Sequence, residues 1–114
     1  RLRETIKREV SVEYYAHEYI VQLVRATRFP GEFGLKSLEG CLRLGASPRG
    51  TMALRDAARV EAFLHNRRHV YPEDIQAIAK DVLRHRIFLE FSAEAKGLTV
   101  ETVLQEILDG VHVP

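Results

Sequence analysis

The chain has 114 residues, of which 46% are hydrophobic and 29% are charged, an ordinary balance for one globular domain that excludes a disordered chain. Lysine and arginine number 17 and aspartate and glutamate 16, so the net charge of +1 gives no general attraction to polyanions. The single cysteine excludes an internal disulfide and a Cys-based zinc site, and the short apolar runs predict no membrane-spanning helix.

The small net charge conceals an uneven distribution. Residues 43–69 hold six arginines against two acids, which gives this stretch a charge of +4. Residues 70–83 and 84–114 each sum to −2. A basic centre between acidic stretches is typical of a local anion-facing surface, and equally of a solvated helix face.

The first predicted elements are helical. Residues 1–9 follow the pattern of a helix end. Ser11 is a favourable N-cap, and apolar residues then recur at spacings of three and four, which predicts a helix over 12–28. Pro30 and Gly31 mark its end.

The stretch 29–47 differs from the rest because it contains four glycines and one proline. These residues break any long helix, so we expect a loop. Its leucines indicate that the loop packs onto the domain, and one short helical turn is expected within 35–42.

Ser47 and Pro48 predict the start of a second helix, which runs to about His65. Serine is a favoured N-cap, and proline suits the first helical position because its missing N–H costs nothing there. The expected inner face of this helix consists of Ala53, Leu54, Ala57, Ala58, Val60, Glu61 and Leu64.

The remaining elements are short. Pro72 opens a helix whose first turn carries Glu73 and Asp74, and the cationic residues 84–86 close it. Residues 87–91 are expected to be extended, and Ser92 is expected to cap a short helix that ends at Gly97. Thr99 caps a last helix, which stops at Gly110. The fold class predicted is therefore all-α, a small helical bundle with at most one short extended segment.

The motifs of several kinds of enzyme are absent from the sequence. It contains neither a G-x-x-x-x-G-K-[ST] phosphate loop nor a G-x-S-x-G nucleophile elbow. His65 and His69 stand four residues apart, but His69 lies beyond the expected helix end, so capping or surface roles are favoured over a metal site. Cys41 is interpreted as a small apolar residue under the loop.

Arg49 is the strongest candidate for a functional residue. It lies in the first turn of the helix opened by Ser47 and Pro48, where the helix dipole already contributes positive charge. A cation at this place favours a bound anion such as phosphate. The alternative is an ordinary surface arginine paired with a carboxylate.

Five stretches resemble one protein family in order and spacing. Residues 19–28 resemble the first lid helix of the MoxR-type AAA+ ATPases, and residues 44–49 (L-G-A-S-P-R) its G-A-S-P-R segment. Residues 71–75 (Y-P-E-D-I) and 82–87 (V-L-R-H-R-I) resemble two further motifs, and 111–114 the family's C-terminus. The resemblance covers nearly the whole chain.

This resemblance implies that residues 1–114 are a single domain, the C-terminal lid of a larger AAA+ ATPase, with 1–10 as the linking helix from the core. It implies that Arg49 is the sensor-2 arginine that reaches the γ-phosphate, supported by Gly45, Ala46, Ser47 and Pro48. ATP and Mg²⁺ would bind the full-length protein. Partners would be the upstream core, neighbouring subunits of a ring, as in a hexamer, and von Willebrand factor A domain proteins, in the cytoplasm.

Two further expectations accompany the resemblance. The chain lacks the phosphate cradle and metal ligands that phosphoryl transfer needs, so we expect it neither to hydrolyse ATP alone nor to hold free nucleotide tightly. Tyr71 stands where the family has Thr or Ser as an N-cap, a loss of ~1 kcal/mol. The alternative functions are a helical protein-interaction module and a nucleic-acid-binding module, of which the second conflicts with the small net charge.

Overall fold

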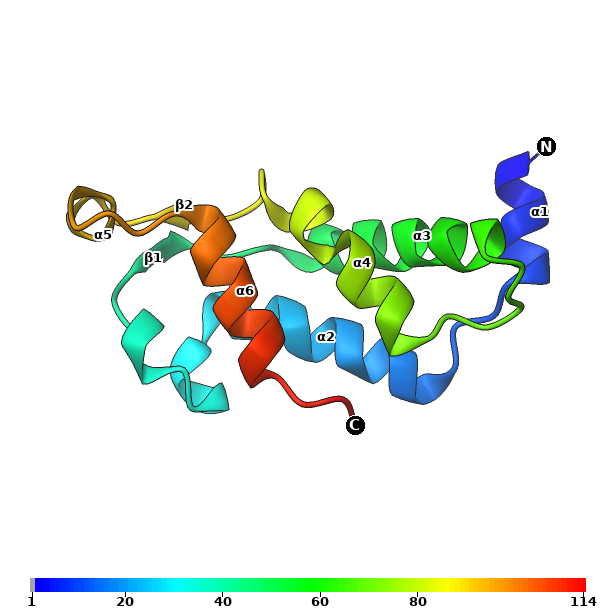
Figure 1. The fold of residues 1–114 in the computed structure, drawn as a ribbon, viewed down its shortest axis with the longest axis horizontal. Coiled ribbons are helices and arrows are strands. Elements are labelled where there is room, and N and C mark those ends of the chain that lie inside the picture. Colours follow the sequence, from blue (N-terminus) through cyan, green and yellow to red (C-terminus); the bar gives the residue numbers. More distant parts are fainter. Residues whose placement is uncertain (1) are drawn as a thin grey trace.

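The computed structural model describes residues 2–114, without the side chain of residue 3, and shows a mostly helical domain of 45 × 26 × 21 Å (Figure 1). Residue 1 of the predicted linking helix lies outside the described part. The elements in chain order are α1 (Leu2–Glu9), α2 (Tyr14–Arg28), η1 (Pro30–Phe33), η2 (Lys36–Leu38), β1 (Leu42–Leu44), α3 (Pro48–Leu64), α4 (Pro72–Leu83), β2 (Phe88–Leu89), α5 (Phe91–Ala95) and α6 (Val100–Gly110).

The hydrophobic core lies where α2, α3, α4 and α6 meet. Helices α3 and α4 pack closely side by side, and α6 crosses α2 and α4 (Figure 1). The largest side chains that are fully buried come from all four helices: Tyr19, Ile20, Leu23, Leu54, Ile75, Leu83, Leu104 and Ile107. The predicted helical bundle is confirmed.

Helix α2 ends at Arg28 as predicted, but Ser11 does not cap its start. The N-cap position is Glu13, and Ser11 instead forms an isolated parallel bridge with His69. The backbone N–H of Ser11 donates to Arg68 O at 2.9 Å, and that of Val70 donates to Ser11 O at 3.0 Å. The prediction was wrong because these tertiary hydrogen bonds hold the segment extended.

The loop 29–47 contains more regular structure than predicted. Two 3₁₀ turns, η1 and η2, replace the one expected helical turn, and a strand, β1, follows them. The predicted extended segment is present as β2, and it pairs antiparallel with β1 through Leu42 and Leu89. This small sheet and α5 lie at the opposite end of the molecule from α1 (Figure 1).

Helix α3 starts as predicted but buries a different face. Leu54, Ala58 and Ala62 are fully buried, while Val60 and Leu64 are 42% and 69% exposed. Residues four apart share one face of a helix, so the buried set follows Leu54 and excludes Val60 and Leu64. The predicted inner face was therefore partly wrong.

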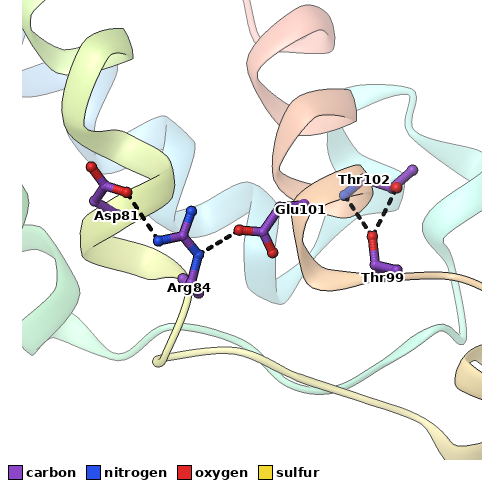
Figure 2. A network of polar contacts seen from close by, with 5 residues as sticks. All are labelled: Asp81, Arg84, Thr99, Glu101 and Thr102. Atoms are coloured by element: carbon purple, nitrogen blue, oxygen red, sulfur yellow. Dashed lines mark hydrogen bonds and ion pairs between the residues drawn. The ribbon is translucent and has the colours of Figure 1, made fainter.

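The last two helices differ in how well their starts were predicted. Glu90, not Ser92, occupies the N-cap position of α5, so the predicted cap was wrong. Thr99 caps α6 as predicted, and its hydroxyl accepts the N–H of Thr102 at 3.2 Å (Figure 2). Side-chain contacts with α4 therefore decide little here, because the cap is local.

The start of α4 has an N-cap position without a capping hydroxyl of the usual kind, as the sequence indicated. Asp74, which is 2% exposed, accepts the backbone N–H of Tyr71 at 2.8 Å and a hydrogen bond from Arg67. The guanidinium of Arg67 also lies over the Tyr71 ring, 5.0 Å from its centre. This cluster offsets the missing Thr or Ser and fixes the turn between α3 and α4.

Candidate functional site

The candidate site is the N-terminus of α3, and its local chemistry agrees with the sequence. The Ser47 hydroxyl accepts the backbone N–H of Arg49 at 3.2 Å, and Pro48 is the first helical residue. The N–H of Gly50 donates to Ser47 O at 2.8 Å. These contacts fix the first turn and place Arg49 on the surface, where its side chain is exposed.

The segment before this helix is fixed by α2. Ala46 is fully buried, and its backbone N–H donates to the Thr27 hydroxyl at 2.9 Å. That hydroxyl donates in turn to Val24 O at 2.6 Å. Thr27 therefore connects the last turn of α2 to the start of α3, a role that sequence reasoning missed because it treated Thr27 only as part of an apolar stripe.

Gly45 is required by a close approach of two backbones. A Cβ atom at this position would lie 2.4 Å from Thr27 O and 2.7 Å from Arg28 Cγ, so any side chain would force the two segments apart. The glycine of the G-A-S-P-R segment thus lets the segment lie directly on the end of α2.

Gly50 lies against the end of α4. It is buried, and a Cβ atom there would lie 3.1 Å from Ala46 Cβ, 3.5 Å from Leu83 Cδ2 and 3.8 Å from Arg86 Cδ. The first turn of α3 is consequently enclosed on one side by α2 and on another by the residues that follow α4.

The electrostatics of this helix start favour an anion. The first turn of α3 contains no acidic residue, so nothing on the helix itself offsets the positive end of the helix dipole. Among the residues that the structure describes, no carboxylate pairs with Arg49. An arginine fork beside free helical N–H groups is suited to phosphate oxygens.

The histidines do not form a metal site. His65 Nδ1 lies 2.9 Å from the carbonyl of Glu61 on its own helix, whereas His69 Nδ1 lies 2.9 Å from Ser11 Oγ. Within residues 2–114, no group of three or more His, Cys, Asp or Glu side chains could hold a metal ion. Mg²⁺ prefers oxygen ligands from carboxylates and phosphates, so these residues do not fit it on their own.

Ser11, Glu13 and His69 lie close together but do not form a catalytic triad. Glu13 Oε2 is 3.0 Å from Ser11 Oγ and 3.4 Å from His69 Nδ1. The hydroxyl and the carboxylate therefore meet the same ring nitrogen, whereas a triad needs them at opposite nitrogens. This cluster fastens the α1–α2 junction to the α3–α4 turn.

Cys41 and the membrane question add no further site. The Cys41 thiol is half-buried and lies 3.5 Å from the carbonyl of Ser37, as expected for a small residue under the loop. No helix in the described part of the chain combines the length and the apolar character that a membrane span requires.

Comparison with known proteins places these features in a family. Residues 37–107 match the AAA lid domain family, and this match covers more than half of the chain. The chain is 34% identical to chaperone MoxR1 of Mycobacterium tuberculosis over 110 residues, which cover 93% of the chain and 29% of the relative. It is 38% identical to protein MoxR of Methylorubrum extorquens over 118 residues, covering 99% of the chain and 34% of the relative.

A solved structure shows the same fold. The chain superimposes with a TM-score of 0.92 and 38% identity on a candidate ATPase from Cytophaga hutchinsonii, covering 96% of the chain and 33% of that protein. The chain therefore spans about a third of the length of these relatives. Family, relatives and fold agree that this chain is a lid domain of the MoxR family of AAA+ ATPases.

Proposed function

We propose that residues 1–114 are the C-terminal lid of a larger AAA+ ATPase and that the lid closes over ATP held by an upstream core. The observation that carries the proposal is Arg49, exposed and without a carboxylate partner among the described residues, at a helix start fixed by Ser47 and Thr27. Because its backbone is held from two sides, the arginine presents a cation at a defined place.

In this proposal Arg49 binds the γ-phosphate and so distinguishes ATP from ADP. An arginine that gains a phosphate contact only in the ATP state favours the closed lid in that state, and the loss of the contact releases it. Gly45, Ala46, Ser47 and Pro48 support this role by positioning the first turn of α3. The residues present fit phosphate oxygens, while Mg²⁺ would be held by residues of the core.

The wider context of the lid is part of the same proposal. The full-length protein would be an ATPase that forms a ring with neighbouring subunits, for example a hexamer, in the cytoplasm. It would act in a chaperone-like way and engage von Willebrand factor A domain proteins. The name of the mycobacterial relative, chaperone MoxR1, supports the chaperone part of this proposal.

The test of the sensor role uses the full-length protein. Arg49→Ala should reduce steady-state ATP turnover by at least tenfold while nucleotide-free folding stays unchanged. Arg68→Ala is the matched control, because Arg68 is 80% exposed and lies beyond the other end of α3. Wild-type turnover in Arg49→Ala would reject the sensor role.

A protein-interaction module without a nucleotide role is the second candidate. It is favoured by Phe91, which is 87% exposed at the first position of α5 and lies near the exposed Phe88. Aromatic side chains are enriched at protein interfaces, and exposed ones are costly to leave in water. Phe91→Ser that abolishes function while Arg49→Ala leaves ATP turnover intact would favour this candidate.

A further inference from the structure

The arginines of this chain divide into two groups. Arg25, Arg59, Arg67, Arg68 and Arg84 each pair with at least one carboxylate. Among the described side chains, the arginines without such a partner are Arg8, Arg28, Arg43, Arg49, Arg55 and Arg86. Five of these six belong to α3 or to segments near its start, so the unpaired cations are concentrated in one region.

Three of the unpaired arginines come from different elements that meet at the first turn of α3. Arg28, the last residue of α2, has its side-chain stem against Gly45. Arg86, which follows α4, has its stem beside Gly50. Arg49 lies between these two glycines. The term three-arginine surface is used below for Arg28, Arg49 and Arg86.

The nearest acids are used by other partners. Asp56 is the first acid of α3 and pairs with Arg59, 3.9 Å away. Asp81 of α4 pairs with Arg84 at 2.9 Å, and Glu101 of α6 also binds Arg84 (Figure 2). These two carboxylates raise the pKa of Arg84 above its usual value, mainly through the side-chain hydrogen bond with Glu101.

Arg84 and Arg86 therefore show two different situations two residues apart. The charge of Arg84 is neutralised inside the domain by two acids, as Figure 2 shows. The charge of Arg86 is not neutralised, although its side chain is only partly exposed and lies beside a helix start that is itself positive. Like charges at this density are unfavourable unless an anion joins them.

We propose that Arg28 and Arg86 act with Arg49 to hold a chain of linked phosphates, such as the triphosphate of a nucleotide, and that the site extends beyond one γ-phosphate. This inference rests on the proposed function and adds two binding residues to it. Each guanidinium can contact two oxygens, and three of them from separate elements can contact more than one phosphate group. A polyphosphate bound there would connect α2, α3 and the end of α4.

The test measures binding to the isolated chain, which contains a complete hydrophobic core. Inorganic tripolyphosphate is titrated into ¹⁵N-labelled protein at 50 mM salt, with orthophosphate as the comparison. Tripolyphosphate should shift the amide signals of residues 45–50 and bind at least tenfold more tightly than orthophosphate. Equal affinities for the two probes would overturn the proposal, because they would show contact with one phosphate group.

Three single variants assign the contacts. Arg28→Gln and Arg86→Gln keep most of the side-chain stem, and each should weaken tripolyphosphate binding at least threefold. Arg8→Gln is the matched control, because Arg8 is also exposed and without a carboxylate partner in the described part of the chain but lies on α1. Equal losses in all three variants would indicate attraction by net charge only and would contradict the site.

Two further readouts keep the result clear. Circular dichroism and urea unfolding show whether a variant has lost its fold, and Arg86→Lys should recover part of the affinity because it restores a cation. Unchanged binding in both Arg28→Gln and Arg86→Gln would reject the added residues, whatever Arg49→Ala does to ATP turnover. Conversely, wild-type turnover in Arg49→Ala would reject the sensor role and leave tripolyphosphate binding in place.

Discussion

The hydroxyl of Thr27 accepts the backbone N–H of Ala46 at 2.9 Å across 19 residues of sequence, and both residues are fully buried. The same hydroxyl donates to Val24 O at 2.6 Å, so both of its hydrogen-bonding functions are used inside the domain. One small side chain at the end of α2 therefore sets where α3 begins and where Arg49 lies.

Thr27→Val keeps the shape of this side chain and removes both hydrogen bonds. The N–H of Ala46 would stay buried without a partner, a loss of ~1–3 kcal/mol in the free energy of unfolding. Urea denaturation followed by circular dichroism measures it. Thr102→Val is the control, because Thr102 is exposed, and it should change stability by less than about 0.5 kcal/mol.

Gly45→Ala tests the close approach of α2 to the segment before α3. The added methyl would lie 2.4 Å from the backbone oxygen of Thr27, which cannot rotate away, so we expect a loss of ~1–3 kcal/mol. In Gly31→Ala the nearest atoms belong to the side chain of Glu39, which is exposed and can move aside. Similar melting temperatures for the two variants would contradict this reading of Gly45.

Ser47 has two separable properties, its capping oxygen and its lack of charge. Ser47→Ala removes the acceptor for the Arg49 N–H and should cost ~0.5–2 kcal/mol. Ser47→Asp restores a capping oxygen and should recover most of that stability, but its carboxylate would neutralise the three-arginine surface and weaken tripolyphosphate binding. Urea unfolding and the tripolyphosphate titration, run on both variants, separate the two effects.

Asp74 should contribute more to stability than any exposed acid of the domain. It is 2% exposed and accepts hydrogen bonds from Arg67 and from the N–H of Tyr71, so Asp74→Ala leaves both donors without their partner and should cost ~2–4 kcal/mol. Asp81→Ala removes a carboxylate that is 74% exposed and should cost less than about 1 kcal/mol. Thermal unfolding that ranks the two variants the other way would show that the Asp74 cluster is not the main fastening of the α3–α4 turn.

The features that sequence reasoning predicted correctly depend on neighbouring residues. Ser47 caps α3 and Thr99 caps α6 through hydrogen bonds that span two and three residues, and Pro48 opens α3 as its type suggests. Arg49 could be selected as a candidate for the same reason, since its place in the first turn follows from Ser47 and Pro48. Local chemistry is sufficient for such features.

The features that it missed depend on residues far away in sequence. Ser11 resembles a cap, but its partners Arg68 and His69 lie 57 and 58 residues later. Strand β1 could not be predicted because its partner β2 begins at Phe88. The roles of Thr27 and Gly45 follow from contact between two segments that a loop separates, and no local pattern reports such contacts.

The placement of Arg49 by Thr27 means that the intervening stretch need not hold it. Gly34 and Gly40 have positive φ angles and open space around them, so the chain at these two points is bounded by solvent. Residues could be inserted there, a fluorophore attached, or a binding peptide displayed, with the helix start still held from α2. The segment 29–44 is thus free to vary in length and sequence between members of the family while the arginine keeps its position.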